Sequence, residues 1–152
     1  MILATLCYLQ RAGKTLMIHR VKRVDDIHLG KWNGLGGKFK PGESPEECVI
    51  REVREESGLE INHPRLHGLV MFPGFKGNNW YVFVYTAETF SGDLKENEEG
   101  FLQWIPNAEL ESLELWPSDH FFLPWLQGEK FFSAKFIYNG DKFLSHEVVF
   151  HP

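Results

Sequence analysis

Residues 37–59 read GKFKPGESPEECVIREVREESGL, and this stretch decides the fold. Five residues separate Gly37 from Glu43, seven more precede Arg51, and a run of residues 52–59 that is rich in glutamate follows. Glycine, glutamate and arginine each make up about 5–7% of ordinary proteins, so chance would give this pattern far less than about once in a million chains of this length. The pattern therefore indicates a specific structure and chemistry.

The stretch predicts a helix whose two ends are both marked. Ser44 is followed by Pro45, the favoured residue for a first helical position, and by Glu47 three residues on, which completes a capping box. Gly58 suits the position just after a helix ends. We expect a helix of about thirteen residues, roughly 20 Å long.

Three glutamates of this helix should share one face. Glu52, Glu55 and Glu56 have the i, i+3, i+4 spacing, so they fall within roughly 100° of one another. Repulsion among three carboxylates is relieved by a hard divalent cation, and Mg²⁺ prefers carboxylate oxygens while keeping waters and phosphates as further ligands. The alternative is a solvated acidic surface. A glycine loop directly before the helix, suited to close approach of phosphates, favours the cation site instead.

Other residues of the stretch are expected to be structural. Arg51 neighbours Glu55 on the helix and can reach Glu43, which would fix the glycine loop against the helix. Val49 and Val53 should anchor the helix on a sheet.

The rest of the chain predicts an α+β fold with a mixed sheet covered by helices. The segment Gly30–Gly42 holds five glycines and reads as a loop. A second helix is expected after Pro117, and residues 1–152 should form one domain. Alternating and aromatic patterns predict strands at 2–10, 15–20, 66–72, 80–88, 101–105, 131–138 and 143–150.

Composition excludes several classes of protein. Charged residues make up 24% of the 152 residues and the net charge is −5, so electrostatic capture of long nucleic acid is not expected. No segment has the length and apolarity of a membrane span or the features of a signal peptide. Cys7 and Cys48 fit small apolar fillers in a reducing compartment better than a disulfide, which favours a cytoplasmic location.

Residues 37–59 resemble the Nudix box, and every defining position is met. The resemblance implies an α/β/α sandwich around a mixed sheet and hydrolysis of a nucleoside diphosphate derivative with Mg²⁺, for which Mn²⁺ can substitute. It also implies attack on phosphorus by a metal-activated water, with a glutamate accepting the proton. Glu52, Glu55, Glu56 and the carbonyl of Gly36 would be metal ligands, and Glu99, or less firmly Glu98, would complete the site.

Two further segments resemble the MutT-type hydrolases of oxidised purine nucleoside triphosphates. They are residues 32–38, WNGLGGK, and residues 116–119, WPSD; the closing hairpin at 131–150 is also similar. The resemblance implies that Asn33 and Asp119 bond to the purine edge and that Trp116 and Phe72 stack on the base. The remaining expected substrate-binding residues are Thr5 and Arg20, on the sugar and phosphate side, and the glycine-loop residues Gly36, Gly37 and Lys38.

Each base-binding residue also has a structural alternative. Trp116 and Phe72 could be core residues, Asn33 a turn residue, and Asp119 a helix cap. Ser118 departs from the family pattern, which has a second acid there, and a single carboxylate should read fewer purine patterns.

The sequence thus predicts an Mg²⁺-dependent hydrolase that converts 8-oxo-dGTP to the monophosphate and pyrophosphate, acting as a monomer or homodimer on a small nucleotide, with no membrane partner. Within the same chemistry, dihydroneopterin triphosphate, ADP-ribose and 5′-triphosphorylated RNA are alternative substrates. A non-catalytic nucleotide-binding module is the alternative from another class, against which the full set of glutamates counts. A histidine-bound transition metal is a further alternative, but the seven histidines are dispersed along the chain, which counts against such a site.

Overall fold

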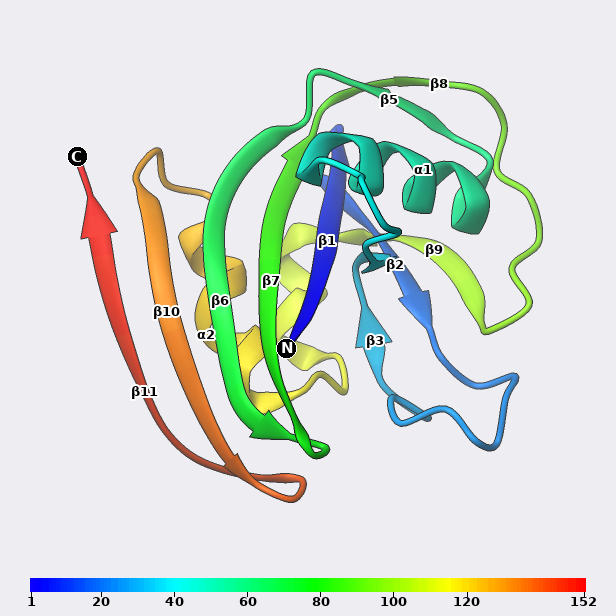
Figure 1. The fold of residues 1–152 in the computed structure, drawn as a ribbon. Coiled ribbons are helices and arrows are strands. Elements are labelled where there is room, and N and C mark those ends of the chain that lie inside the picture. The colour runs from blue at the N-terminus through cyan, green and yellow to red at the C-terminus, as the bar shows by residue number, and fades with distance from the viewer.

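A strongly curved mixed sheet forms the body of the protein, as the computed structural model of residues 1–152 shows (Figure 1). Its main path runs β11-β10-β6-β7-β1-β2-β3, with β4 paired to β1 and β9 paired to β2. The pairs β1/β7 and β6/β10 are parallel and the others are antiparallel. The strands of this sheet are β1 (Ile2–Arg11), β2 (Lys14–His19), β3 (Trp32–Asn33), β4 (Leu35–Lys38), β6 (Arg65–Phe75), β7 (Asn78–Ala87), β9 (Phe101–Pro106), β10 (Phe131–Asn139) and β11 (Lys142–His151).

Helix α1 (Pro45–Ser57) has the length and both ends that the sequence predicts. The Ser44 hydroxyl accepts from the Glu47 N–H at 3.1 Å, and the Glu47 carboxylate accepts from the Ser44 N–H at 2.9 Å. At the other end Gly58 adopts a left-handed conformation with φ of 80°, and its N–H donates to the Arg54 carbonyl. Because both ends are satisfied locally, the helix presents a fixed face to the rest of the site.

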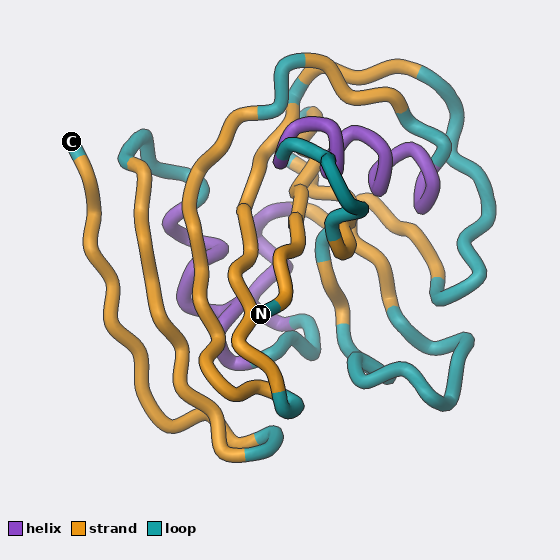
Figure 2. The backbone as a smooth tube through the Cα atoms, viewed as in Figure 1, coloured by secondary structure: helices purple, strands orange, loops and turns teal.

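The two α-helices lie on opposite faces of the sheet (Figure 2). A separate apolar cluster of buried side chains lies under each helix. Val49 and Val53 of α1 are fully buried in one cluster, as expected. In the other, Phe122 and Leu123 of α2 (Pro117–Trp125) pack on strands β1, β6 and β10. The helix, sheet and helix layers confirm the predicted α/β/α arrangement and the α+β class.

The segment Gly30–Gly42 is not wholly a loop, which corrects the sequence-based expectation. Residues 32–33 and 35–38 form β3 and β4, and β4 pairs antiparallel with β1 from Cys7/Leu35 to Ala4/Lys38. A Cβ on Gly36 would lie 2.0 Å from the Thr5 carbonyl oxygen. Glycine at this position therefore allows β4 to approach β1 closely, and does not mark a bend in a loop.

Three short elements were absent from the predicted set. Strands β5 (Glu60–Asn62) and β8 (Thr89–Ser91) pair with each other beside α1, and a 3₁₀ helix, η1 (Asn107–Ser112), follows β9. Both cysteines are free and buried, in agreement with the sequence. None of the helices has the length and apolar character needed to cross a membrane.

Candidate active site

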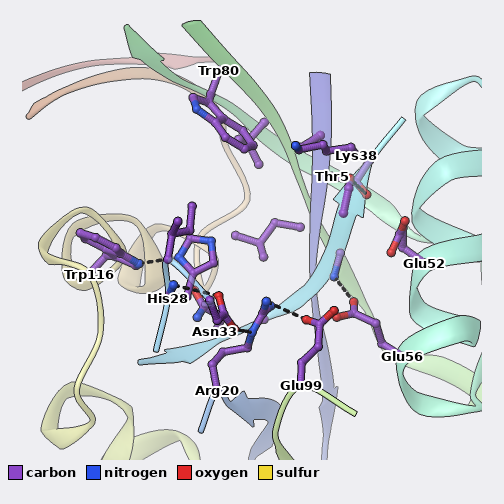
Figure 3. Close-up of a pocket in the computed structure, with 18 of the residues that line it drawn as sticks. Thr5, Arg20, His28, Asn33, Lys38, Glu52, Glu56, Trp80, Glu99 and Trp116 are labelled. Atoms are coloured by element: carbon purple, nitrogen blue, oxygen red, sulfur yellow. Dashed lines mark hydrogen bonds and ion pairs between the residues drawn. The ribbon is translucent and has the colours of Figure 1, made fainter. Parts of the chain in front are cut away.

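A cavity of about 880 Å³ opens between α1, the sheet and the start of α2. Figure 3 shows its two ends, with glutamates near α1 and Trp116, His28 and Asn33 at the other end. The structure brings every predicted site residue to its wall: Thr5, Arg20, Asn33, Gly36, Gly37, Lys38, Glu52, Glu55, Glu56, Phe72, Glu99, Trp116 and Asp119. Glu98, the less favoured candidate, lines it as well.

Glu56 is the most enclosed of the α1 glutamates. Its Oε1 accepts the Gly36 N–H at 2.6 Å, which ties α1 to β4. The pKa of Glu56 is raised to about 8, mainly by burial and also by the nearby carboxylates of Glu52 and Glu99, while the Gly36 N–H and Arg20 oppose the rise. The predicted face of three glutamates on α1 is therefore joined by a fourth acid, Glu99, from the segment before β9.

Arg51 holds the glycine segment against the helix, as the sequence predicts. Its guanidinium donates to both Glu43 oxygens at 2.5 and 2.8 Å, and to the Lys38 carbonyl at 3.1 Å. It also donates to Glu52 at 2.7 Å and to Glu55 at 3.1 Å. This pairing lowers the pKa of Glu43 to about 2, with the Arg51 hydrogen bond as the main cause.

The segment before β9 carries Glu99 to the cavity. Asn97 fixes this segment, because its amide oxygen accepts the Glu99 N–H at 2.7 Å and its amide nitrogen donates to the Glu56 carbonyl at 2.9 Å. The Glu99 carboxylate pairs with Arg20 at 2.6 Å, and Arg20 also pairs with Asp26 at 2.6 Å. Arg20 thus lines the cavity with its charge shared between two acids.

The donor chemistry around α1 fits a hard divalent cation. Carboxylates of Glu52, Glu56 and Glu99 and the backbone of Gly36 surround the same end of the cavity, and oxygen ligands of this kind suit Mg²⁺ or Mn²⁺. No three acidic, histidine or cysteine side chains lie close enough together to hold a metal ion as they stand. Glu52 forms an ion pair with Arg51, and Glu99 forms one with Arg20. These two carboxylates would therefore have to move away from their arginines to bind a cation.

Asn33 and Asp119 stand at the other end with unusual polar environments. Asn33 lies in β3 and not in a turn, and its Nδ2 is buried without a hydrogen-bond partner. Asp119 is buried and does not cap α2, whose N-cap is Trp116 with no side-chain bond. Burial raises the pKa of Asp119 to about 7, although the Ser118 hydroxyl, which donates to it at 3.2 Å, and the Lys31 cation oppose the rise.

The two aromatic candidates are both packed and available to the cavity. Trp116 is 7% exposed and meets Phe75 and Tyr138 edge-on, while Phe72 stacks on Phe136 with 5.8 Å between ring centroids. The core alternative and the binding role therefore coexist, because each ring lines the cavity with part of its surface.

Three residues of the site were not found from the sequence. Asp26 holds Arg20, Asn97 anchors the Glu99 segment, and the His28 Nδ1 accepts the Trp116 indole N–H at 2.8 Å. Asp26 and His28 come from an irregular segment and Asn97 precedes β9, so no periodic pattern marks them. The only sequence signal was their proximity in the chain to Arg20, Trp32 and Glu99.

Comparison with known proteins agrees with this geometry. The model of the NUDIX domain matches residues 2–126. The chain is 34% identical over 151 residues to the uncharacterised Nudix hydrolase YvcI of Bacillus subtilis, covering 95% of this chain and 92% of the relative. It is also 34% identical over 122 residues to the mouse oxidized purine nucleoside triphosphate hydrolase, covering 78% of each. A MutT protein of Bacillus halodurans has a similar crystal structure, with a TM-score of 0.87, 27% identity and 97% of each chain covered.

The fold, the acidic helix and the adjoining cavity define a hydrolase of pyrophosphate bonds in nucleotide-derived substrates. The chain belongs to the Nudix hydrolase family.

Proposed function

We propose that the protein hydrolyses an oxidised purine nucleoside triphosphate, with 8-oxo-dGTP as the preferred substrate, to the monophosphate and pyrophosphate. The observation that carries the proposal is the pairing, in one cavity, of an unpartnered buried amide donor on Asn33 with the buried carboxyl of Asp119. A buried donor without a partner costs about 1–3 kcal/mol, so a ligand that accepts from it regains that energy. The mouse relative's name agrees with this choice of substrate.

The base would occupy the end of the cavity with Trp116 and Phe72 as its aromatic walls. The Asn33 amide donates to an acceptor on the base, and Asp119 accepts from ring N–H groups when ionised or donates when neutral. One acid and the Ser118 hydroxyl replace the two acids of the family pattern, so the protein should read fewer purine forms.

The phosphates would extend toward α1, past the side chain of Lys38 and the backbone of Gly37, which both line the cavity. Thr5 contributes mainly to the wall, because its hydroxyl lies 3.4 Å from the Cys48 sulfur and 3.5 Å from the Gly37 carbonyl oxygen. One or more Mg²⁺ ions held by Glu52, Glu56, Glu99 and the Gly36 carbonyl, with Glu55 beside them, would neutralise phosphate charge and activate water. A glutamate of this set accepts the proton that water loses on attack.

Residues 1–152 are proposed to act as one domain on a small nucleotide. The net charge of −5 does not favour electrostatic capture of long nucleic acid.

The substrate can be tested by measuring kcat/KM for pyrophosphate release with Mg²⁺. The panel is 8-oxo-dGTP, dGTP, 2-hydroxy-dATP, CTP, dihydroneopterin triphosphate, ADP-ribose and a triphosphorylated RNA. Where pyrophosphate is not the product, turnover is followed as orthophosphate or, for ADP-ribose, as AMP. The proposal predicts that 8-oxo-dGTP leads and that Asn33→Ala lowers its kcat/KM by roughly 5- to 30-fold. Asn62→Ala, an exposed residue of β5 outside the cavity, is the matched control. A lead by any other substrate refutes the assignment.

A further inference from the structure

His28 belongs to the base end of the cavity, although neither the resemblance nor the fold singles it out. It lies in the segment between β2 and β3, lines the cavity, and sits beside Trp116 in Figure 3. Its ring meets the Trp116 indole edge-on, and its Nδ1 accepts the indole N–H at 2.8 Å.

That hydrogen bond decides which ring nitrogen carries the proton. An indole N–H can only donate, so Nδ1 must be unprotonated and the neutral ring carries its proton on Nε2. Burial lowers the pKa of His28 to about 4, and the Arg20 cation adds to the effect, so the ring is neutral at pH 7. Nε2–H makes no hydrogen bond within the protein and remains a free donor at the cavity wall.

The backbone around His28 holds the ring in place before any ligand arrives. The His28 N–H donates to Asp26 Oδ1 at 2.9 Å and its carbonyl accepts the Lys31 N–H at 2.8 Å. Asp26 is in turn paired with Arg20. A donor fixed in this way loses little entropy on binding, which is what a group that discriminates between ligands requires.

We propose that the Nε2–H of His28 donates to a carbonyl oxygen of the bound base and so selects oxidised guanine over oxidised adenine. This inference rests on the proposed function and adds the base preference. With Asn33 Nδ2, the cavity wall then offers two donors from the protein. Oxidised guanine carries carbonyl oxygens at C6 and C8, which can both accept hydrogen bonds. 8-Oxoadenine carries an amino group at C6, so a donor of the protein would face a donor of the base and remain unpaired.

The test compares kcat/KM for 8-oxo-dGTP and 8-oxo-dATP in the wild type, His28→Phe and His28→Gln. Phenylalanine keeps a ring but has no polar atom, while glutamine can both accept from Trp116 and donate to a base. We expect His28→Phe to lower the preference for 8-oxo-dGTP about 5-fold or more, and His28→Gln to recover most of it. An equal loss on both substrates would show that His28 only supports Trp116, and would overturn the inference.

A second measurement is made on the wild type alone and does not depend on the variants folding. Nitrogen-15 NMR of the wild-type imidazoles, with the His28 signals assigned through their connection to the His28 backbone resonances, reports the proton position at pH 7. The inference requires the proton on Nε2 alone, and a proton on Nδ1 or on both nitrogens overturns it while leaving the proposed function intact. If the wild type hydrolyses no purine nucleoside triphosphate, the proposed function fails and this inference fails with it.

Discussion

Replacing Asp119 with asparagine should change how stability depends on pH. The residue is 6% exposed, and burial raises the pKa of its carboxyl from 3.8 to about 7. The fold therefore favours the neutral acid, while the unfolded chain releases the proton near pH 4. Between about pH 4 and pH 7 the folded state binds more protons, so this group makes the free energy of unfolding fall as pH rises. Above about pH 7 the contribution of this carboxyl to the free energy of unfolding no longer changes with pH.

The size of the effect follows from the pKa difference. At 1.36 kcal/mol per pH unit, a difference of about 3 units corresponds to at most about 4 kcal/mol. Asparagine has no proton to lose, so the free energy of unfolding of Asp119→Asn minus that of the wild type should rise by up to about 4 kcal/mol from pH 4 to pH 8. Titrations common to both proteins cancel in this difference.

Urea unfolding followed by far-ultraviolet circular dichroism at pH 4, 5.5, 7 and 8 measures this difference. Ser118→Ala is the companion variant, because it removes the hydroxyl that stabilises the ionised carboxyl and should extend the fall in stability to higher pH. A difference between Asp119→Asn and the wild type that stays constant with pH would refute the reasoning about this carboxyl.

Further predictions concern the acidic face and the breadth of the site. Glu56→Gln should lower kcat by roughly 100-fold or more at unchanged circular dichroism, because an amide of nearly the same shape cannot ionise to bind a cation or accept a proton; near-normal turnover would contradict the site assignment. Gly37→Ala should spare the fold but lower activity, since the new Cβ would lie 2.5 Å from the movable Glu52 carboxylate. Gly36→Ala meets backbone at 2.0 Å instead and should destabilise the protein by roughly 1–3 kcal/mol in urea unfolding, and equal melting of the two alanine variants would count against this distinction. Ser118→Asp should raise kcat/KM for 2-hydroxy-dATP relative to 8-oxo-dGTP, and an unchanged ratio would remove Ser118 from the account of breadth.

The sequence predicted the features that local chemistry dictates. Ser44, Pro45, Glu47 and Gly58 satisfy the ends of α1 by bonds within a few residues, so its bounds could be read directly. The spacing of the glutamates fixes their shared face for the same reason, since helical geometry alone places them.

Features that depend on distant partners could not be read in this way. Strands β3 and β4 have few apolar residues, and only pairing with β1 and β2 extends a glycine-rich chain that looks like a loop by itself. His28 becomes significant only when the fold places it against Trp116, 88 residues away in the chain. Ser118 and Asp119 were visible as a motif, but their burial, which sets the pKa of the acid, comes from packing of α2 on the sheet.

The central claim is tested most directly by competition between two substrates in one reaction. The protein is mixed with equal concentrations of 8-oxo-dGTP and dGTP in Mg²⁺, and both monophosphates are followed by chromatography, so that the ratio of initial rates is the ratio of kcat/KM values. The account predicts 8-oxo-dGMP and pyrophosphate as the first products, with a ratio of about 10 or more that falls in Asn33→Ala. Equal consumption of the two nucleotides, or release of orthophosphate in place of pyrophosphate, would contradict it.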